Sequence, residues 1–226
     1  MPETGTPAAS SGVMTQRRPT DAATERAQRR APQKAPPLPH ARRVLLLVDV
    51  INSFDFDGGE RLAVQVRPVL PVIAELKAAL RRQGVPAVYV NDNFGHWTAD
   101  FRQLLARCRA AGGAAAATVR ALAPAGDDLT VLKPRHSGFY ATPLQLLLTQ
   151  MGTRELVIAG FATDACVQLT AADAYQRGFS LWVPADACAA QDGARHEAAL
   201  QWLRQSVGAH TNVAGSVRRL PKRGQP

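Results

Sequence analysis

Three side chains of complementary chemistry, Asp49, Lys133 and Cys166, each stand at or near the end of a short apolar run. A cysteine sulfur can attack a carbonyl carbon, a carboxylate can carry protons to and from the reacting groups, and an ammonium group can stabilise negative charge. For each residue alone an ordinary role fits as well, because most free cysteines are core residues and most polar residues after a strand are turn residues. The three together favour a catalytic site.

Cys166 has the most informative setting of the three. It follows the apolar run 156–160 and lies beside residues 163–164, where a helical pattern begins. The unpaired N–H groups and the dipole of a helix N-terminus favour a thiolate over a thiol. The sequence therefore predicts a reactive cysteine in the first turn of a helix that follows a buried strand.

Strand-like and helical patterns alternate along the chain. Strand-like runs lie near residues 43–49, 86–91, 129–133, 155–160 and 179–183, with a weaker candidate near 211–214. Helical patterns lie near 61–83, 98–111, 141–151, 164–177 and 191–207, and the alanine-rich stretch 110–117 is interpreted as a helix end and a loop. This alternation predicts a three-layer α/β/α, Rossmann-like single domain with a mostly parallel sheet of about six strands. Because the carboxyl ends of parallel strands share one edge, Asp49, Lys133 and Cys166 would meet there.

The basic charge of the chain belongs to its ends. The formal net charge is +9, but residues 1–43 hold 8 Lys and Arg against 3 Asp and Glu, and residues 204–226 hold 5 against none. We predict a disordered basic tail over 1–40, a folded domain over 41–216 and a basic tail over 217–226. No nucleic-acid motif accompanies these ends, so no specific nucleic-acid partner is expected. No apolar run is long enough to cross a membrane or to act as an export signal, so we expect a cytoplasmic protein without a membrane partner.

Three segments of the sequence resemble the isochorismatase-like cysteine hydrolases, the superfamily that includes nicotinamidase and N-carbamoylsarcosine amidase. The family's first motif, Asp-x-x-Asn-x-Phe, is matched here by Asp49, Asn52 and Phe54. Its second motif, a Lys followed by Ser-x-Phe, is matched by Lys133, Ser137 and Phe139. Its third motif, Gly-x-Ala-Thr-Asp-x-Cys-Val, is matched by residues 160–167. The resemblance covers about residues 43–207, with the motifs in the family's order and spacing. It implies that the domain over 41–216 is an isochorismatase-like hydrolase domain.

The resemblance also implies a Cys-Asp-Lys triad that hydrolyses a C–N bond through a thioester. Cys166 would attack the carbonyl of a small amide, carbamoyl or ureido compound, and Lys133 would stabilise its thiolate. Asp49 would protonate the leaving amine and then activate water. A cis peptide bond between Phe161 and Ala162 is implied as well, with the N–H groups of Ala162 and Cys166 forming an oxyanion hole.

The segment that holds a metal in nicotinamidases differs here. Those enzymes carry an Asp-x-His pair and a later His, whereas residues 88–97 offer only Asp92 and His96. A metal site needs three or more properly spaced ligands, so we expect neither a metal nor another cofactor. The chain has 3 Cys without a CxxC pair, which argues against a disulfide framework or a zinc site.

Two alternatives of other classes remain open. The first is an isochorismatase-type ether hydrolase, although such enzymes tend to lack the cysteine that stands here at position 166. The second is a non-catalytic binding or assembly protein on the same fold. The joint presence of Asp49, Lys133 and Cys166 favours the amide hydrolase.

The substrate and the assembly are specified only loosely. Phe54, Trp97 and Phe161 are the predicted substrate-binding residues, because each lies within a few residues of a strand end, although aromatic residues at such places are equally often core. Apolar walls favour a small planar or aliphatic amide as the substrate. The resemblance further implies a homodimer or a homotetramer.

Deletion of residues 1–40 is expected to leave folding and turnover nearly unchanged. The segment has no apolar periodicity, and all three predicted catalytic residues lie beyond it. Circular dichroism and specific activity of the truncated and full-length chains would test this. Loss of activity at unchanged secondary-structure content would show instead that the tail contacts the active site.

Overall fold

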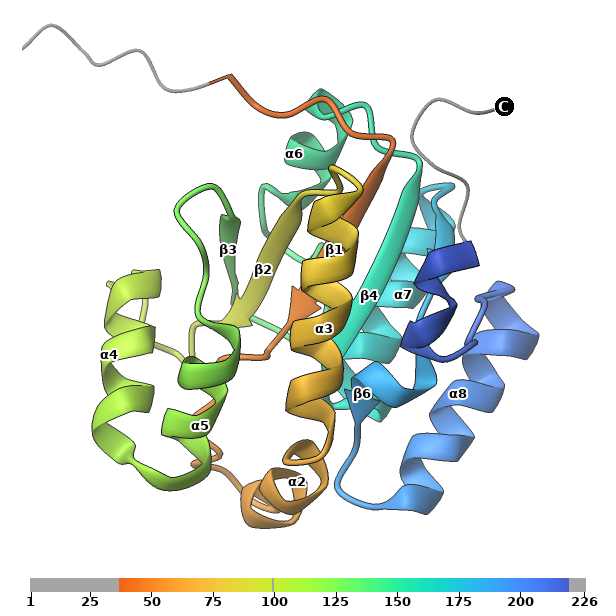
Figure 1. Cartoon of the computed structure of the whole chain (residues 1–226). Coiled ribbons are helices and arrows are strands. Elements are labelled where there is room, and N and C mark those ends of the chain that lie inside the picture. The colour runs from red at the N-terminus through yellow and green to blue at the C-terminus, as the bar shows by residue number, and fades with distance from the viewer. Residues whose placement is uncertain (1–36, 99, 220–226) are drawn as a thin grey trace, which may run out of the picture. The chain divides into compact units, whose positions relative to one another are not determined.

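The computed structural model describes residues 37–98 and 100–219 (Figure 1). Nearly all of the predicted tail over 1–40, and most of the tail over 217–226, lie outside the described residues. The domain boundaries at 41 and 216 therefore stay predictions. Among the described residues, no helix combines the length and the apolar character needed to cross a membrane.

Six strands form one sheet in the described part of the chain. They are β1 (Arg43–Val48), β2 (Ala87–Asp92), β3 (Leu129–Lys133), β4 (Glu155–Phe161), β5 (Ser180–Trp182) and β6 (Cys188–Ala189). Their order is β3-β2-β1-β4-β5, and β6 pairs with the end of β4. Every pairing is parallel. The chain thus leaves β1 toward β2 and β3 and returns to β4 on the other side, which places a topological switch point between β1 and β4.

Helices join and cover these strands. The α-helices of the described residues are α2 (Gly59–Val66), α3 (Val69–Arg82), α4 (Phe101–Ala111), α5 (Gly113–Leu122), α6 (Leu144–Gln150), α7 (Gln168–Gln176) and α8 (Gly193–Val207). Three shorter segments are the π-helical turn η1 (Thr163–Val167) and the 3₁₀ turns η2 (Ala185–Ala187) and η3 (Ala214–Arg219). Figure 1 shows α3 in front of the sheet and α7 behind it.

Alternate side chains of β1 enter two separate apolar cores. Leu45 and Leu47 pack in the core that contains residues of α2, α3, α4 and α5. Val44, Leu46 and Val48 pack in the core that contains residues of α6, α7 and α8. A strand that is buried on both faces has a continuous apolar sequence rather than an alternating one, as β1 does. The predicted three-layer α/β/α fold with a mostly parallel sheet is confirmed.

Local predictions were wrong in three places. The helical pattern near 61–83 is two helices, α2 and α3, which are separated at Arg67–Pro68. The alanine-rich stretch that we read as a helix end and a loop does end α4 at Ala111, but it then starts α5 instead of a loop, because the Gly112–Gly113 pair ends one helix and alanine readily begins the next. The candidate strand near 211–214 is not a strand. His210 makes one bridge to Trp182, and the chain then turns into η3, while the sixth strand is the short β6.

Gly160 allows β1 and β4 to approach closely at their carboxyl ends. Its φ is +133°, and a Cβ added there would lie 2.0 Å from the carbonyl oxygen of Val48. A side chain at this position would therefore both strain the backbone and push the two strands apart.

Gly160→Ala is expected to lower the free energy of unfolding by about 2–4 kcal/mol, the sum of backbone strain and forced overpacking. Urea denaturation would measure the change. Gly126→Ala is the matched control, because a Cβ at Gly126 meets no atom within 4 Å and should change stability little. Equal stability of the Gly160 and Gly126 variants would contradict this account of the β1–β4 contact.

Candidate active site

Three strand ends deliver the three predicted catalytic side chains to one place. Asp49 directly follows β1, and its N–H donates to the carbonyl of Val90 in β2. Lys133 is the last residue of β3. Cys166 lies in η1, which begins two residues after β4. The π-helical turn is a tertiary detail that the helical pattern at 164–177 did not indicate, and such turns are frequent at functional sites.

The Lys133 ammonium group connects these side chains. Its Nζ lies 2.8 Å from Asp49 Oδ2 and 3.5 Å from Cys166 Sγ. A third neighbour is Asp92 at the end of β2, whose Oδ2 lies 3.4 Å from the same nitrogen. Lys133 is fully buried, with 0% of its side chain exposed. A buried ammonium group requires such partners, because its desolvation is otherwise far too costly.

The electrostatics of the site keep Lys133 charged. Burial by itself lowers the pKa of Lys133, but the acidic groups around it, Asp49 first, raise that pKa well above its ordinary value. The raised pKa of Lys133 favours its charged form.

The pKa values of the Cys166 thiol and of the Asp49 carboxyl are both raised, which favours their protonated forms. Burial and then the Asp49 charge raise the pKa of Cys166, and they outweigh the opposing effect of Lys133. Burial likewise raises the pKa of Asp49 against the effect of Lys133. The raised pKa of Asp49 makes its carboxylate a better proton acceptor than an ordinary aspartate.

Other motif residues shape the backbone around the site. Asn52 accepts a hydrogen bond from the N–H of Phe54 at 2.8 Å. Ser137 donates to Asp173 of α7, and its oxygen accepts from the N–H of Phe139. These contacts fix the segments that follow Asp49 and Lys133.

A cavity of about 380 Å³ opens over the sulfur of Cys166. Of the predicted substrate-binding residues, Phe161 lines it. Phe54 is buried in an apolar core, and Trp97 is 79% exposed; neither is among the cavity's lining residues. The pocket prediction for Phe54 and Trp97 is thus not supported, because a position near a strand end does not fix the direction of a side chain.

The predicted oxyanion-hole residues also border this cavity. Ala162 and Cys166 both line it, and the peptide bond between Phe161 and Ala162 is cis.

Six of the cavity's lining residues were not predicted from the sequence: Phe56, Leu62, Phe94, His136, Gln191 and Arg195. The nearest to the sulfur is His136, whose Nδ1 lies 3.4 Å from Cys166 Sγ. Its position three residues after Lys133 was the available signal. No signal in the sequence pointed to Arg195, because α8 begins well after the three motifs. The Nε of Arg195 donates a hydrogen bond to Asp164 Oδ2 at 2.5 Å.

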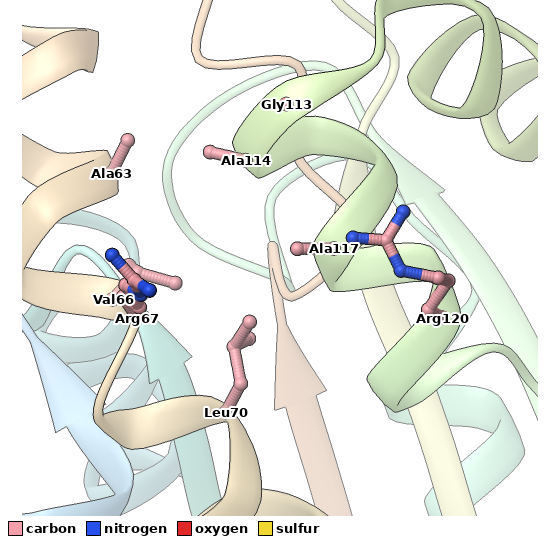
Figure 2. A pocket seen from close by; sticks show the side chains of 8 residues that line it. All are labelled: Ala63, Val66, Arg67, Leu70, Gly113, Ala114, Ala117 and Arg120. Atoms are coloured by element: carbon pink, nitrogen blue, oxygen red, sulfur yellow. The ribbon is translucent and has the colours of Figure 1, made fainter.

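A second cavity, of about 350 Å³, lies between α2, α3 and α5, and none of the predicted catalytic residues lines it. Figure 2 shows its apolar side chains, with Arg67 and Arg120 also among the residues that line it. It has no thiol, carboxylate or histidine, so the chemistry of the described residues points to the cavity over Cys166.

Comparison with known proteins agrees with this site. The family model described as "Isochorismatase domain" matches residues 43–214. The chain is 38% identical over 177 residues to the uncharacterized isochorismatase family protein YaaI of Bacillus subtilis, which covers 78% of this chain and 97% of that protein. It is 32% identical over 200 residues to the ureidoacrylate amidohydrolase RutB of Methylorubrum extorquens, covering 76% and 79% of the two chains.

A solved structure is similar to this chain in fold as well as in sequence. The crystal structure of nicotinamidase/pyrazinamidase PncA from Bacillus subtilis superimposes with a TM-score of 0.59 at 27% identity, covering 76% of this chain and all of that one. The family model alone spans well over half of the chain. Fold, motifs and relatives therefore agree that this chain belongs to the isochorismatase family and is a hydrolase.

Proposed function

We propose that this chain is a cysteine hydrolase that cleaves the C–N bond of a small amide, carbamoyl or ureido compound through a thioester. The observation that carries the proposal is the contact of one buried ammonium group, that of Lys133, with both Asp49 and Cys166 at the floor of a cavity. The names of two relatives, a ureidoacrylate amidohydrolase and a nicotinamidase, support amide-type chemistry.

In the first half of the reaction, Cys166 Sγ attacks the substrate's carbonyl carbon as its proton passes to Asp49. The raised pKa of Asp49 suits it to accept this proton, and Lys133, which stays protonated, balances the negative charge of the site. The N–H groups of Ala162 and Cys166 are the proposed donors to the oxyanion. Asp49 then protonates the leaving nitrogen, the C–N bond breaks, and a thioester on Cys166 remains.

In the second half, water attacks the thioester and restores the thiol. A base must take a proton from the water molecule as its oxygen bonds to the carbonyl carbon. Asp49, ionised again once it has protonated the amine, is one such base. The product leaves as a carboxylic or carbamic acid, and Cys166 regains its proton.

The substrate class can be tested directly. The cavity of about 380 Å³ admits only a small compound, and its walls combine Phe56, Phe94 and Phe161 with the charged head group of Arg195. We propose ammonia release as the assay, with nicotinamide, ureidoacrylate and N-carbamoyl amino acids as the panel. Failure of every amide and ureido compound would contradict the proposed class of reaction.

Cys166→Ala and Cys166→Ser are expected to lower hydrolysis on the order of 10⁴-fold or more, because the covalent step needs the sulfur. Asp49→Asn is expected to cost at least ~10²-fold, because it removes the proton carrier. Steady-state kinetics on the best compound of the panel would measure both.

Cys108→Ala is the matched control for these variants. Cys108 is a buried cysteine in α4, away from the cavity, so its loss should leave turnover close to that of the parent. Retained turnover in a clean Cys166→Ala preparation would end the proposed mechanism. Activity of Asp49→Asn within about tenfold of the parent would remove the acid–base role, which ordinarily contributes 10²–10⁴-fold.

We also propose that the reaction needs no metal. The side chain of Asp92 is already engaged by Lys133 and by the N–H of Phe94, and the described residues contain no group of three or more His, Cys, Asp and Glu side chains arranged to hold an ion. Activity is expected to survive chelation and dialysis, and purified protein should contain no stoichiometric zinc or iron by elemental analysis. A tightly bound equivalent of metal that is lost in Asp92→Asn or His96→Gln would show that this loop is a metal site.

A further inference from the structure

His136 is a second side chain in contact with the sulfur of Cys166. Its Nδ1 lies 3.4 Å from Cys166 Sγ, and its side chain is exposed and borders the cavity. Lys133 approaches the same sulfur at 3.5 Å but is fully buried. The sulfur thus has one fully buried charged partner, Lys133, and one exposed imidazole partner, His136.

The loop that carries His136 is fixed at both ends. Lys133 anchors it to the end of β3, and Ser137 anchors it to α7 through its hydrogen bond to Asp173. The N–H of Gly138 donates to Thr170 Oγ1 at 3.0 Å, and Phe139 stacks on Phe179. Only three residues separate Lys133 from Ser137, so the position of the imidazole beside the sulfur is set by buried contacts and not by a free loop.

Asp49 is less well placed to reach an incoming water molecule. Its Oδ1 accepts the N–H of Asp92 at 2.7 Å, and its Oδ2 is paired with Lys133 at 2.8 Å. Its side chain is only 6% exposed. A carboxylate offers about four lone-pair sites, of which these two contacts occupy two in the thioester state, where Cys166 no longer carries a proton to donate.

We infer that His136 is a further catalytic residue, the base that activates water in the second half of the reaction. The inference rests on the proposed thioester intermediate. In the tautomer that carries its proton on Nε2, the Nδ1 lone pair takes a proton from water while the water oxygen bonds to the thioester carbon. The C–S bond then breaks, the sulfur leaves with the electron pair, and Nδ1 returns the proton to Sγ, the atom beside which it lies.

In this scheme Asp49 carries out only the proton transfers of the first half of the reaction. It differs from the single-base cycle that the family resemblance implies, so the two halves should respond differently to substitution of His136. The difference can be measured without knowledge of the natural substrate.

The experiment uses 4-nitrophenyl acetate, which acetylates a nucleophilic cysteine and releases 4-nitrophenolate. His136→Gln is expected to form the acetyl-enzyme at nearly the parent's rate, but to hydrolyse it about 10²-fold more slowly, the usual contribution of a general base. Stopped-flow absorbance reports the first step. Intact mass, with peptide mapping to Cys166, follows the decay of the acetyl group.

Two further variants make the result specific. His136→Ala should show the same slow decay, and added imidazole should restore the decay rate, because the exposed position leaves room for a small base. His96→Gln is the matched control, since it removes another exposed histidine that does not line the cavity.

Each outcome decides between the alternatives. Parent-like decay of the acetyl-enzyme in His136→Gln would overturn the inference and leave Asp49 as the base of both halves. Equal slowing of both steps, without rescue by imidazole, would also overturn it, because that pattern belongs to a residue that only positions the loop. Acetylation that persists in Cys166→Ala would instead contradict the proposed function itself, which is a distinguishable failure.

Discussion

The structure of this site depends on the burial of one ammonium group. Lys133 is fully enclosed, and such a charge is tolerated only where carboxylates lie within a few ångströms of it. Asp49 and Asp92 supply them from the ends of β1 and β2. This requirement fixes the positions of three strand ends relative to one another. The same ammonium group reaches the sulfur of Cys166, so the interaction that makes the burial of Lys133 tolerable also assembles the reacting groups.

The sheet order explains why these strands and no others supply the groups. β1 lies at the centre, with β2 and β3 on one side and β4 on the other. The switch point between β1 and β4 brings Asp49 next to the turn that carries Cys166, and Gly160 permits the close approach of the two strands there. Lys133 comes from β3, two strands away from β1, and its long side chain spans β2. A shorter cation at this position would not make both contacts.

Burial and charge act in opposite directions on the ionisable groups of the site. Burial raises the pKa of both Cys166 and Asp49, and the charge of Lys133 does not reverse either shift. In the reaction that we propose, the proton of Cys166 moves as the sulfur attacks, and a carboxylate with a raised pKa is a suitable acceptor. His136, an exposed side chain beside the same sulfur, is the second proton carrier that we propose, which gives the two halves of the proposed reaction separate proton carriers.

The sequence by itself determined the fold class, the family and the three groups at the strand ends, because apolar runs, their order and the motif around Cys166 are local properties of the chain. It also indicated which edge of the sheet holds the site, since parallel strands share that edge. Tertiary structure alone decided the rest. Trp97 lies on the surface, Phe54 lies in the core, and His136 and Arg195 line the cavity, because the direction of a side chain after a strand depends on packing against elements distant in sequence. The direction of the pKa shift of Cys166 also depends on tertiary structure, since burial and the Asp49 charge, which raise that pKa, arise only when the strands are assembled.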